Sequence, residues 1–318
     1  MTRKSYVQSV NISAFWGRKT RLAVETQGER TCGMKLQALA EKTRGLLPLL
    51  RCPLCGEDFS LTDSHSLQCA SRHCYDLSRK GYINLAPGHR QQADKYTTAL
   101  FDCRQAVFSQ GFYEPVMQAI GDVMANHASP SFALLDAGCG EGSYARCLSG
   151  RFPQAEIIGV DISRDAITAA AKSASPVHWL VGDVSRLPVR SGSLAFLLDV
   201  LTPAAYGEFS RVLQPDGLLL KIIPGTDYLC QLRACIQPDL REEGHDSGQV
   251  LAHLQKHAHI LEKITLHHTY AVTPEQSALF ARMTPMTFQF SDEQLSLVSF
   301  SEISIHLDLL VCRMLPHP

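Results

Sequence analysis

The segment that most constrains the fold of this chain is a run of alternating glycines behind an apolar stretch. It reads Leu134-Leu-Asp-Ala-Gly-Cys-Gly-Glu-Gly142, with an acid two positions before the first glycine. Glycines let a backbone approach a bound molecule closely and let a helix pack against a strand. A dinucleotide-binding turn has the different spacing G-x-G-x-x-G, which cradles a pyrophosphate. We therefore expect a strand, a tight turn and a helix that bind a nucleoside carrying an amino acid, with Asp136, Gly138, Gly140 and Gly142 at the ligand.

Two more acids end the apolar runs that follow. Gly159-Val-Asp161 lies nineteen residues beyond Gly142, and Val181-Gly-Asp183 ends the next run. Ligands of open α/β sheets bind at the carboxyl ends of the strands. There, Asp161 would accept hydrogen bonds from both ribose hydroxyls, and Asp183 would contact the exocyclic amine of adenine. The alternatives are a helix cap at Asp161, ahead of Ser163, and a nicotinamide cofactor.

From residue 132 onward, apolar runs alternate with helical segments. Strands joined through helices require right-handed parallel crossovers, which predicts a doubly wound α/β sheet. Residues 97–128 are expected to form two helices broken at Gly111. The predicted strands are 132–136, 156–161, 177–181, 194–200 and 218–223, the helices are 143–149, 163–173 and 206–213, and the tail adds strands 264–272 and 302–313 around a helix at 274–283.

The glycine segment and the two acids resemble the class I (Rossmann-like) methyltransferases. The resemblance implies S-adenosyl-L-methionine as the cofactor and an α/β fold of that class. Intact Asp136, Asp161 and the three glycines argue against a vestigial, non-enzymatic domain.

A separate cluster of metal-ligand residues precedes this domain. Cys52-Pro-Leu-Cys55 is followed by Cys69 after thirteen residues and by His73 after three more. Two such pairs on neighbouring turns complete a tetrahedron around Zn(II), and four protein ligands make the zinc structural because no coordination position stays open. Cys74 is the alternative fourth ligand, and unrelated buried cysteines are the alternative to a metal site.

The zinc segment restricts the kind of methyltransferase that the chain can be. Together with Tyr75-Asp-Leu-x-Arg-Lys-Gly-Tyr-Ile-Asn-Leu85, the segment Arg104–Tyr113 and the closing Ile305-His-Leu307, it resembles the bacterial 23S rRNA guanine-N1 methyltransferases. The resemblance implies transfer of a methyl group to N1 of a guanine in a 23S rRNA hairpin loop, and it alone suggests a homodimer. The loop Leu198–Phe209 looks more like the tylosin-resistance branch, which implies macrolide resistance.

The resemblance also implies cofactor contacts at Tyr113, Gly140, Glu141 and Tyr228. Position 228 departs from the histidine that we associate with the family. Removing the N1 proton calls for a carboxylate or a water. Asp199, near the end of the fourth apolar strand, is the candidate proton acceptor, and a solvated strand end is its alternative role.

Charge gives little support for RNA binding by itself. Residues 1–51 carry a net charge of +7 and residues 52–318 a net charge of -8. Basic groups can hold phosphates and aromatic rings can stack on unpaired bases. The candidate RNA contacts in the zinc module are Arg72, Arg79, Lys80, Arg90 and Lys95, with Tyr75 and Tyr82 between them.

The chain is expected to be cytoplasmic, because no apolar run approaches the roughly 20 residues of a membrane span and no secretory signal is visible. Residues 1–33 have no assigned structure, and Met34 is either the true start or follows a transit peptide. A short helix is expected from Met34 to Leu47. The predicted organisation is a poorly ordered extension at 1–47, a zinc-ribbon-like RNA-recognition module at 48–95, a helical linker at 96–130 and the methyltransferase domain at 131–318. The competing function is methylation of a small molecule, in which zinc has no part in substrate recognition.

Overall fold

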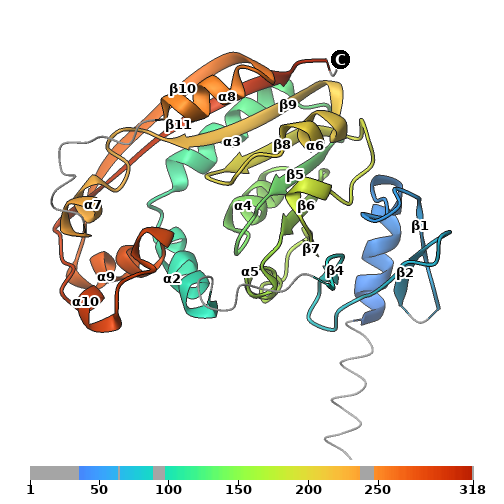
Figure 1. Ribbon diagram of the computed structural model, residues 1–318, viewed down its shortest axis with the longest axis horizontal. Helices are drawn as coiled ribbons and strands as arrows, with labels where there is room; N and C mark the ends of the chain where they lie inside the picture. The colour runs from blue at the N-terminus through green and yellow to red at the C-terminus, as the bar shows by residue number, and fades with distance from the viewer. Residues whose placement is uncertain (1–35, 64, 89–96, 237–246, 317–318) are drawn as a thin grey trace, which may run out of the picture.

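The computed structural model describes residues 36–63, 65–88, 97–236 and 247–316 (Figure 1). The expectations for residues 1–33 and for Arg90 and Lys95 lie outside these ranges. Among the helices within them, none has both the length and the apolar character needed to cross a bilayer. The elements are β1 Phe59–Leu61, β2 Ser66–Cys69, β3 Cys74–Asp76, β4 Ile83–Asn84, α2 Thr98–Ser109, α3 Glu114–His127, β5 Ala133–Ala137, α4 Ser143–Arg151, β6 Glu156–Asp161, α5 Arg164–Ala170, β7 His178–Val181, β8 Leu194–Val200, α6 Tyr206–Val212, β9 Leu213–Pro224, α7 Cys230–Ile236, α8 Gly248–Leu254, β10 Ala258–Ala271, α9 Pro274–Arg282, α10 Asp292–Ser296 and β11 Glu302–Met314, with short 3-10 turns at Leu47–Leu49, Val184–Arg186 and Pro285–Thr287.

The centre of the fold is an eight-stranded sheet in the order β10-β11-β9-β8-β5-β6-β7-β4. All neighbours from β9 to β4 run parallel, whereas β11 runs antiparallel to both β9 and β10. The chain winds outward from β5 in one direction through β6 and β7, and in the other through β8 and β9. This confirms the doubly wound sheet, and it places the topological switch point between the carboxyl ends of β5 and β8.

The inner strands are buried on both faces, which is why they read as continuous apolar runs. Along β8, Leu198 packs with α3 and α4 on one face, whereas Leu197 packs with α6 and α8 on the other. Such alternation follows from the two-residue repeat of a strand. The bounds predicted for β6 and β8 are confirmed.

The helices α2 and α3 are part of the α/β domain. Gly111, with φ +85°, separates them as predicted. Phe101 of α2 packs on Ala166 and Ala169 of α5, and Ile120 of α3 is fully buried in the main core. The description of 96–130 as a linker is therefore wrong for the part of it that the structure describes, because these helices complete a face of the sheet.

The amino-terminal module is joined to the sheet by backbone pairing. Strands β1, β2 and β3 form a small antiparallel sheet, and β4 then extends the large sheet beside β7 (Figure 1). Residues 36–46 form a helix, in which Lys42 Nζ donates hydrogen bonds to the carbonyls of Val177 (2.6 Å) and Ser175 (3.2 Å). The helix predicted near Met34–Leu47 is confirmed in its described part, and the expectation of poor order up to residue 47 is wrong there because Leu46 is fully buried.

Candidate functional site

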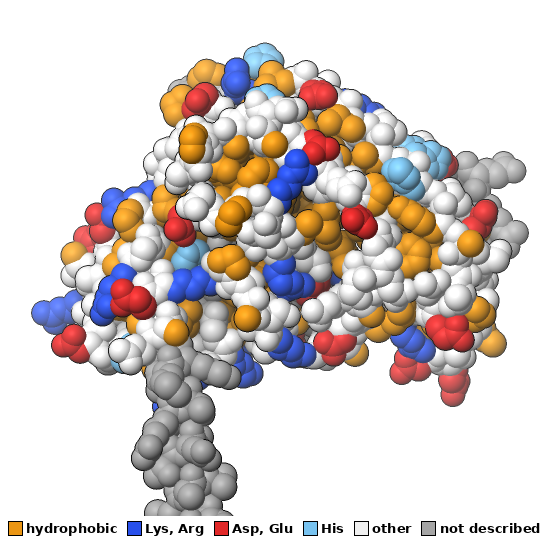
Figure 2. Space-filling view, turned by 180° about the vertical axis from the view of Figure 1, so that it is seen from behind, with side chains coloured by type: hydrophobic (Ala, Val, Ile, Leu, Met, Phe, Trp, Pro, Cys, Tyr) orange, Lys and Arg blue, Asp and Glu red, His pale blue; other side chains and the backbone are white. Residues whose placement is uncertain are grey.

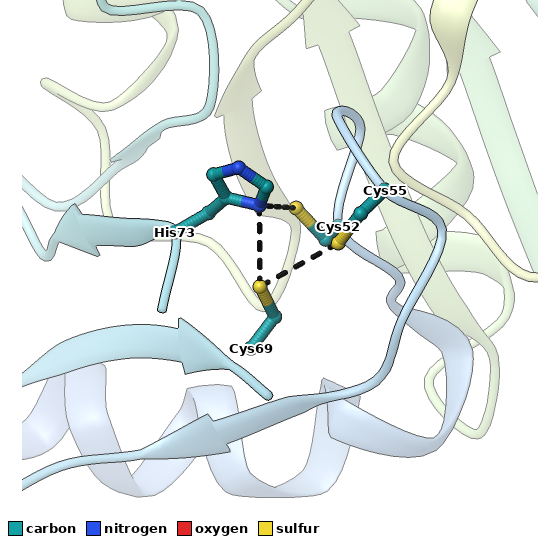
Figure 3. A group of neighbouring side chains, drawn as sticks. All are labelled: Cys52, Cys55, Cys69 and His73. Atoms are coloured by element: carbon teal, nitrogen blue, oxygen red, sulfur yellow. Dashed lines mark hydrogen bonds between the residues drawn. The ribbon is translucent and has the colours of Figure 1, made fainter. Parts of the chain in front are cut away.

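Four side chains in the amino-terminal module converge on one point (Figure 3). His73 Nδ1 lies 3.5 Å from Cys52 Sγ and 3.4 Å from Cys69 Sγ, and Cys55 Sγ lies 3.6 Å from Cys69 Sγ. These separations are close to the edges of the tetrahedron that Zn(II) forms with sulfur and nitrogen ligands. Cys74 is exposed and lies outside this group, so the geometry favours His73 as the fourth ligand.

The turn that carries the first two thiols is a tight knuckle. Gly56, with φ +78°, donates its backbone N–H to the carbonyl of Cys52 (2.8 Å), and Cys52 N–H donates to the carbonyl of Glu57 (2.7 Å). Tyr75 Oη lies 3.8 Å from Cys52 Sγ and supports the site from behind. With four protein ligands the site suits a structural zinc, not a catalytic one.

A second mixed group, Asp227, His267 and His306, is less suited to a metal. The backbone N–H of Asp227 donates to His306 Nδ1 (3.2 Å), which is the ring nitrogen that lies 3.4 Å from the Asp227 carboxylate. A metal would have to displace that hydrogen bond. We assign no ion here.

The glycine turn between β5 and α4 has the backbone that only glycine adopts without strain. Gly138, Gly140 and Gly142 have φ of +72°, +57° and +83°. A Cβ at Gly138 would lie 2.5 Å from Thr202, and one at Gly142 would lie 2.3 Å from Trp179. The turn therefore needs glycine both for its conformation and for its close approach to neighbouring elements.

Asp161 ties this turn to the end of β6. Its Oδ2 accepts the Gly140 N–H (2.8 Å) and its Oδ1 accepts the Ser163 N–H (2.8 Å). Ser163, not Asp161, is the N-cap of α5. Each carboxylate oxygen retains a second lone pair, which is what two ribose hydroxyls require.

Asp136 carries an unsatisfied carboxylate oxygen beneath the turn. The residue is buried, and Oδ2 has no hydrogen-bond partner among the described atoms. Burial, together with the nearby charges of Asp161 and Glu141, raises the pKa of Asp136 to about 8. A buried acceptor without a donor is costly. Asp136 Oδ2 can therefore accept a hydrogen bond from a ligand that brings a positively charged or hydrogen-bonding group.

Three tyrosines lie around the same turn. The hydroxyls of Tyr113 and Tyr228 are 2.9 Å apart, and Tyr113 stacks on Phe108 with ring centroids 4.5 Å apart. Tyr144, in the first turn of α4, has a buried hydroxyl without a partner among the described atoms. Tyr144 was missed by sequence reasoning, although its place just after the glycine turn is where helix residues face a ligand.

Glu141 is engaged within the protein. Its carboxylate pairs with Arg146 (Oε2 to Nη2, 2.7 Å) and accepts the Ser143 hydroxyl (2.9 Å). These contacts fix the first turn of α4. Any contact of Glu141 with a cofactor therefore comes from its backbone or from an oxygen lone pair that these bonds leave open.

The structure brings Asp183 into a cleft between the two parts of the chain. This cleft has a volume of about 440 Å³. It is lined by Asp183 and Ile162 from the sheet edge and by Pro53 and Leu54 from the zinc knuckle. Asp183 Oδ1 accepts hydrogen bonds from Ser185 N (2.8 Å) and Oγ (2.7 Å). The zinc knuckle thus forms one wall of the space beside Ile162 and Asp183, which sequence reasoning did not anticipate.

Asp199 lies in β8 directly beside Ala137 of β5, and its side chain is paired within the protein. It is fully buried, and its Oδ2 accepts a 2.6 Å hydrogen bond from Lys221 Nζ. Burial raises the pKa of Asp199, and the Lys221 ammonium opposes that rise. In β8 it alternates with Leu198, whose side chain lies in the core cluster of Tyr113 and Tyr144. This geometry supports a structural ion pair, and proton acceptance by Asp199 stays a prediction with its own test.

The zinc module presents fewer aromatic contacts than expected. Arg72, Arg79 and Lys80 are exposed, but Tyr75 and Tyr82 are buried. Tyr75 packs edge-on against Phe59 with centroids 5.7 Å apart. The expectation that these two tyrosines stack on RNA bases is therefore wrong, because their rings belong to the core.

Comparisons with known proteins divide the chain in the same way as the structure. Residues 50–93 match the family described as RlmA, N-terminal, a zinc ribbon, and residues 134–217 match the family described as Methyltransferase domain. YxjB of Bacillus subtilis (strain 168), whose name assigns it provisionally as a 23S rRNA (guanine-N(1)-)-methyltransferase, is 31% identical over 275 residues, which are 83% of this chain and 96% of that protein. The 23S rRNA (guanine(748)-N(1))-methyltransferase of Streptomyces fradiae is 27% identical over 86% of this chain and 99% of its own length.

Among solved structures, the YcgJ protein of Bacillus subtilis is similar to part of the chain. It is 20% identical with a TM-score of 0.42, covering 63% of this chain and 99% of YcgJ.

Proposed function

The chain belongs to the family of 23S rRNA (guanine-N1)-methyltransferases, and we propose that it transfers a methyl group from S-adenosyl-L-methionine to N1 of a guanine in a 23S rRNA hairpin loop. One observation carries the proposal: strand β4, within the segment that matches the zinc ribbon, pairs with the last two residues of β7 and so attaches the ribbon beside the carboxyl end of that strand in the large sheet. The two modules therefore face one substrate together. A small-molecule methyltransferase has no need of the zinc ribbon at that edge.

The residues around the glycine turn fit the cofactor. In this proposal Asp161 accepts hydrogen bonds from the ribose hydroxyls, Asp183 contacts the adenine amine, and the unsatisfied oxygen of Asp136 accepts the amino group, which their positions support. Gly138 and Gly140 allow the close approach that the central part of the molecule needs. When bound, the cofactor supplies a methyl group on a positively charged sulfur.

The chain's own contribution to the reaction is mainly to hold the reactants in line. As the new N–C bond forms and the C–S bond breaks, the N1 proton leaves to water or to a carboxylate. Fixed geometry can supply a large part of such a rate. Tyr113, Tyr144 and Tyr228 enclose the space next to the turn, so we assign them to positioning the methyl donor and excluding bulk water.

The RNA is proposed to lie across the zinc module and the sheet edge. Arg72, Arg79 and Lys80 are exposed cations that suit phosphate contacts. Figure 2 shows basic and acidic side chains interspersed over the face it draws, so recognition by a broad positive surface is not expected there. The target guanine must be unpaired or flipped out, because N1 is the hydrogen-bonding edge of a paired guanine.

Finer features of the function are also part of the proposal. The name of the Streptomyces fradiae relative gives guanine 748, so that position is the first to test here. A homodimer and resistance to tylosin-type macrolides are further expectations that follow from the family resemblance.

The test is to incubate the protein with S-adenosyl-L-methionine and a 23S rRNA fragment that contains the hairpin. A methyl group on guanine N1 blocks base pairing, so reverse transcription stops next to the modified base. We expect a stop that requires both enzyme and cofactor. Transfer of labelled methyl groups to small-molecule acceptors, with none to any 23S rRNA fragment, would overturn the proposal in favour of the alternative function.

A further inference from the structure

Arg104 reaches over the glycine turn from a helix that no cofactor motif includes. It lies in α2, and its Nη2 donates a 3.0 Å hydrogen bond to the carbonyl of Met283, 179 residues away in the chain. Its guanidinium also lies over the Phe101 ring, 5.8 Å from the centroid. The group is therefore held in one place by a backbone carbonyl and by an aromatic face.

The unused edge of this guanidinium points at the ligand space. A Cβ at Gly140 would lie 3.4 Å from Arg104 Nη1. No hydrogen bond from Nη1 is found within the described residues, whereas Nη2 is engaged by Met283. A guanidinium offers five N–H donors in a planar fork, so it retains donors for an anion beside the turn.

The surrounding charges show why a cation is useful here. The positive charge of Arg104 lowers the pKa of Asp161 and of Tyr228, both of which burial raises. Arg146, the other guanidinium near the turn, is already paired with Glu141 at 2.7 Å. Next to Gly140 there is therefore one available cation, on Arg104, and Asp136, four positions before Gly140 in the chain, carries an unsatisfied carboxylate oxygen.

A ligand with its ribose at Asp161 must pass over Gly138 and Gly140, and its amino-acid end lies beyond them. That end carries one carboxylate and one ammonium group. We propose that Arg104 binds the carboxylate of the cofactor's methionyl end, while Asp136 accepts the amino group. The inference rests on the proposed function, since it takes S-adenosyl-L-methionine as the ligand.

Two nucleoside ligands distinguish carboxylate binding by Arg104 from a purely structural role of this residue. S-adenosylhomocysteine has the carboxylate, and 5′-methylthioadenosine has the same thioether and nucleoside without the amino acid. We expect Arg104→Gln to weaken S-adenosylhomocysteine binding by about 10- to 100-fold, as loss of charge-assisted hydrogen bonds does. Binding of 5′-methylthioadenosine should stay within about twofold of the wild-type value, which also shows that the variant is folded. Isothermal titration calorimetry measures both.

Two matched variants sharpen the result. Arg104→Lys keeps the charge but loses the planar fork, so its affinity for S-adenosylhomocysteine should be intermediate. Arg282→Gln removes a guanidinium that pairs with Asp292 at 2.7 Å, and it should change neither affinity. Equal weakening of both ligands by Arg104→Gln, or no weakening of either, would overturn the assignment. Failure of the wild-type protein to bind S-adenosylhomocysteine at all would overturn the proposed function and this inference with it.

Discussion

The hydroxyl oxygens of Tyr113 and Tyr228 lie 2.9 Å apart, although 115 positions separate the two residues in the chain. The contact joins the start of α3 to the segment after β9, on either side of the ligand space. Tyr228 occupies a position at which we associate histidine with the family. Its hydroxyl nevertheless gives the buried Tyr113 a partner.

Tyr228→Phe should leave the Tyr113 hydroxyl without a partner in a buried site. The expected cost is about 1 kcal/mol of unfolding free energy, together with a several-fold weaker binding of S-adenosylhomocysteine. Urea denaturation and calorimetry measure the two effects. Tyr270→Phe is the control, since the Tyr270 hydroxyl makes no hydrogen bond within the described residues. Identical behaviour of the two variants would contradict a role for the Tyr113–Tyr228 contact.

Asp136 should make the free protein less stable as the pH rises. Its folded pKa, raised by burial to about 8, lies above the ordinary value of 3.8, so the folded protein holds this proton more tightly than the unfolded chain. Its contribution to stability is then full below pH about 4 and is lost as the pH rises through about 8.

Comparison with Asp136→Asn isolates this contribution, because the other titrating groups are common to both proteins. Between pH 5 and pH 8, the unfolding free energy of the wild type should fall relative to that of the variant by about 1 kcal/mol or more. Urea denaturation at several pH values measures the difference. A difference that stays constant with pH would show that the Asp136 carboxyl is not perturbed.

Variants of Asp199 distinguish a structural role of this residue from a catalytic one. Asp199→Ala leaves the buried Lys221 ammonium unpaired, and breaking a buried pair in this way costs about 3–5 kcal/mol. The double variant Asp199→Leu/Lys221→Met, which removes both charges, should recover much of that loss. If Asp199 also accepts the N1 proton, Asp199→Asn will fold but will lose methyl transfer while S-adenosylhomocysteine binding persists. Retained transfer by a folded Asp199→Asn variant would exclude the catalytic role.

The sequence predicted the inner sheet well for a physical reason. Strands β6 and β8 are buried on both faces, so their residues are apolar throughout and their bounds are visible. Strand β10 is an edge strand with many exposed residues, and its first part, which contains His259, Glu262 and Lys263, has no apolar run. The predicted strand therefore began only at Ile264.

The parts of the candidate site that could be predicted are those whose residues lie close together in the sequence. The zinc ligands and the glycine turn with Asp161 are defined by short spacings, and the structure brings each set together. Arg104 and Tyr144 were missed because their relation to the turn depends on how α2 and α4 pack. Tyr75 was misjudged because an aromatic next to basic residues looks the same in sequence whether its ring is exposed or buried.

The zinc knuckle should affect cofactor binding as well as RNA recognition. Pro53 and Leu54 line the same cleft as Ile162 and Asp183, where we propose that the adenine of the cofactor binds. The knuckle is held against the sheet by the hydrogen bond from Arg51 N to the carbonyl of Pro188 (3.1 Å). Metal binding contributes about 10–16 kcal/mol in comparable small zinc modules, so without the metal the knuckle has little to keep it folded.

Removal of the metal through Cys52→Ser should therefore abolish RNA methylation and weaken S-adenosylhomocysteine binding by several-fold, while leaving that binding measurable. Leu54→Ala should reproduce the weaker nucleoside binding with the zinc retained. Cys74→Ser is the matched control, because this thiol is exposed and outside the ligand group, and it should change neither property. Metal content by chromogenic chelation and affinity by calorimetry provide the measurements.

If Cys52→Ser binds S-adenosylhomocysteine as tightly as the wild type, the knuckle does not support the adenine end of the cleft. If instead the variant loses both binding and cooperative unfolding, the zinc module is required for the fold of the whole chain, because its strand β4 and its docked knuckle then stabilise the sheet itself.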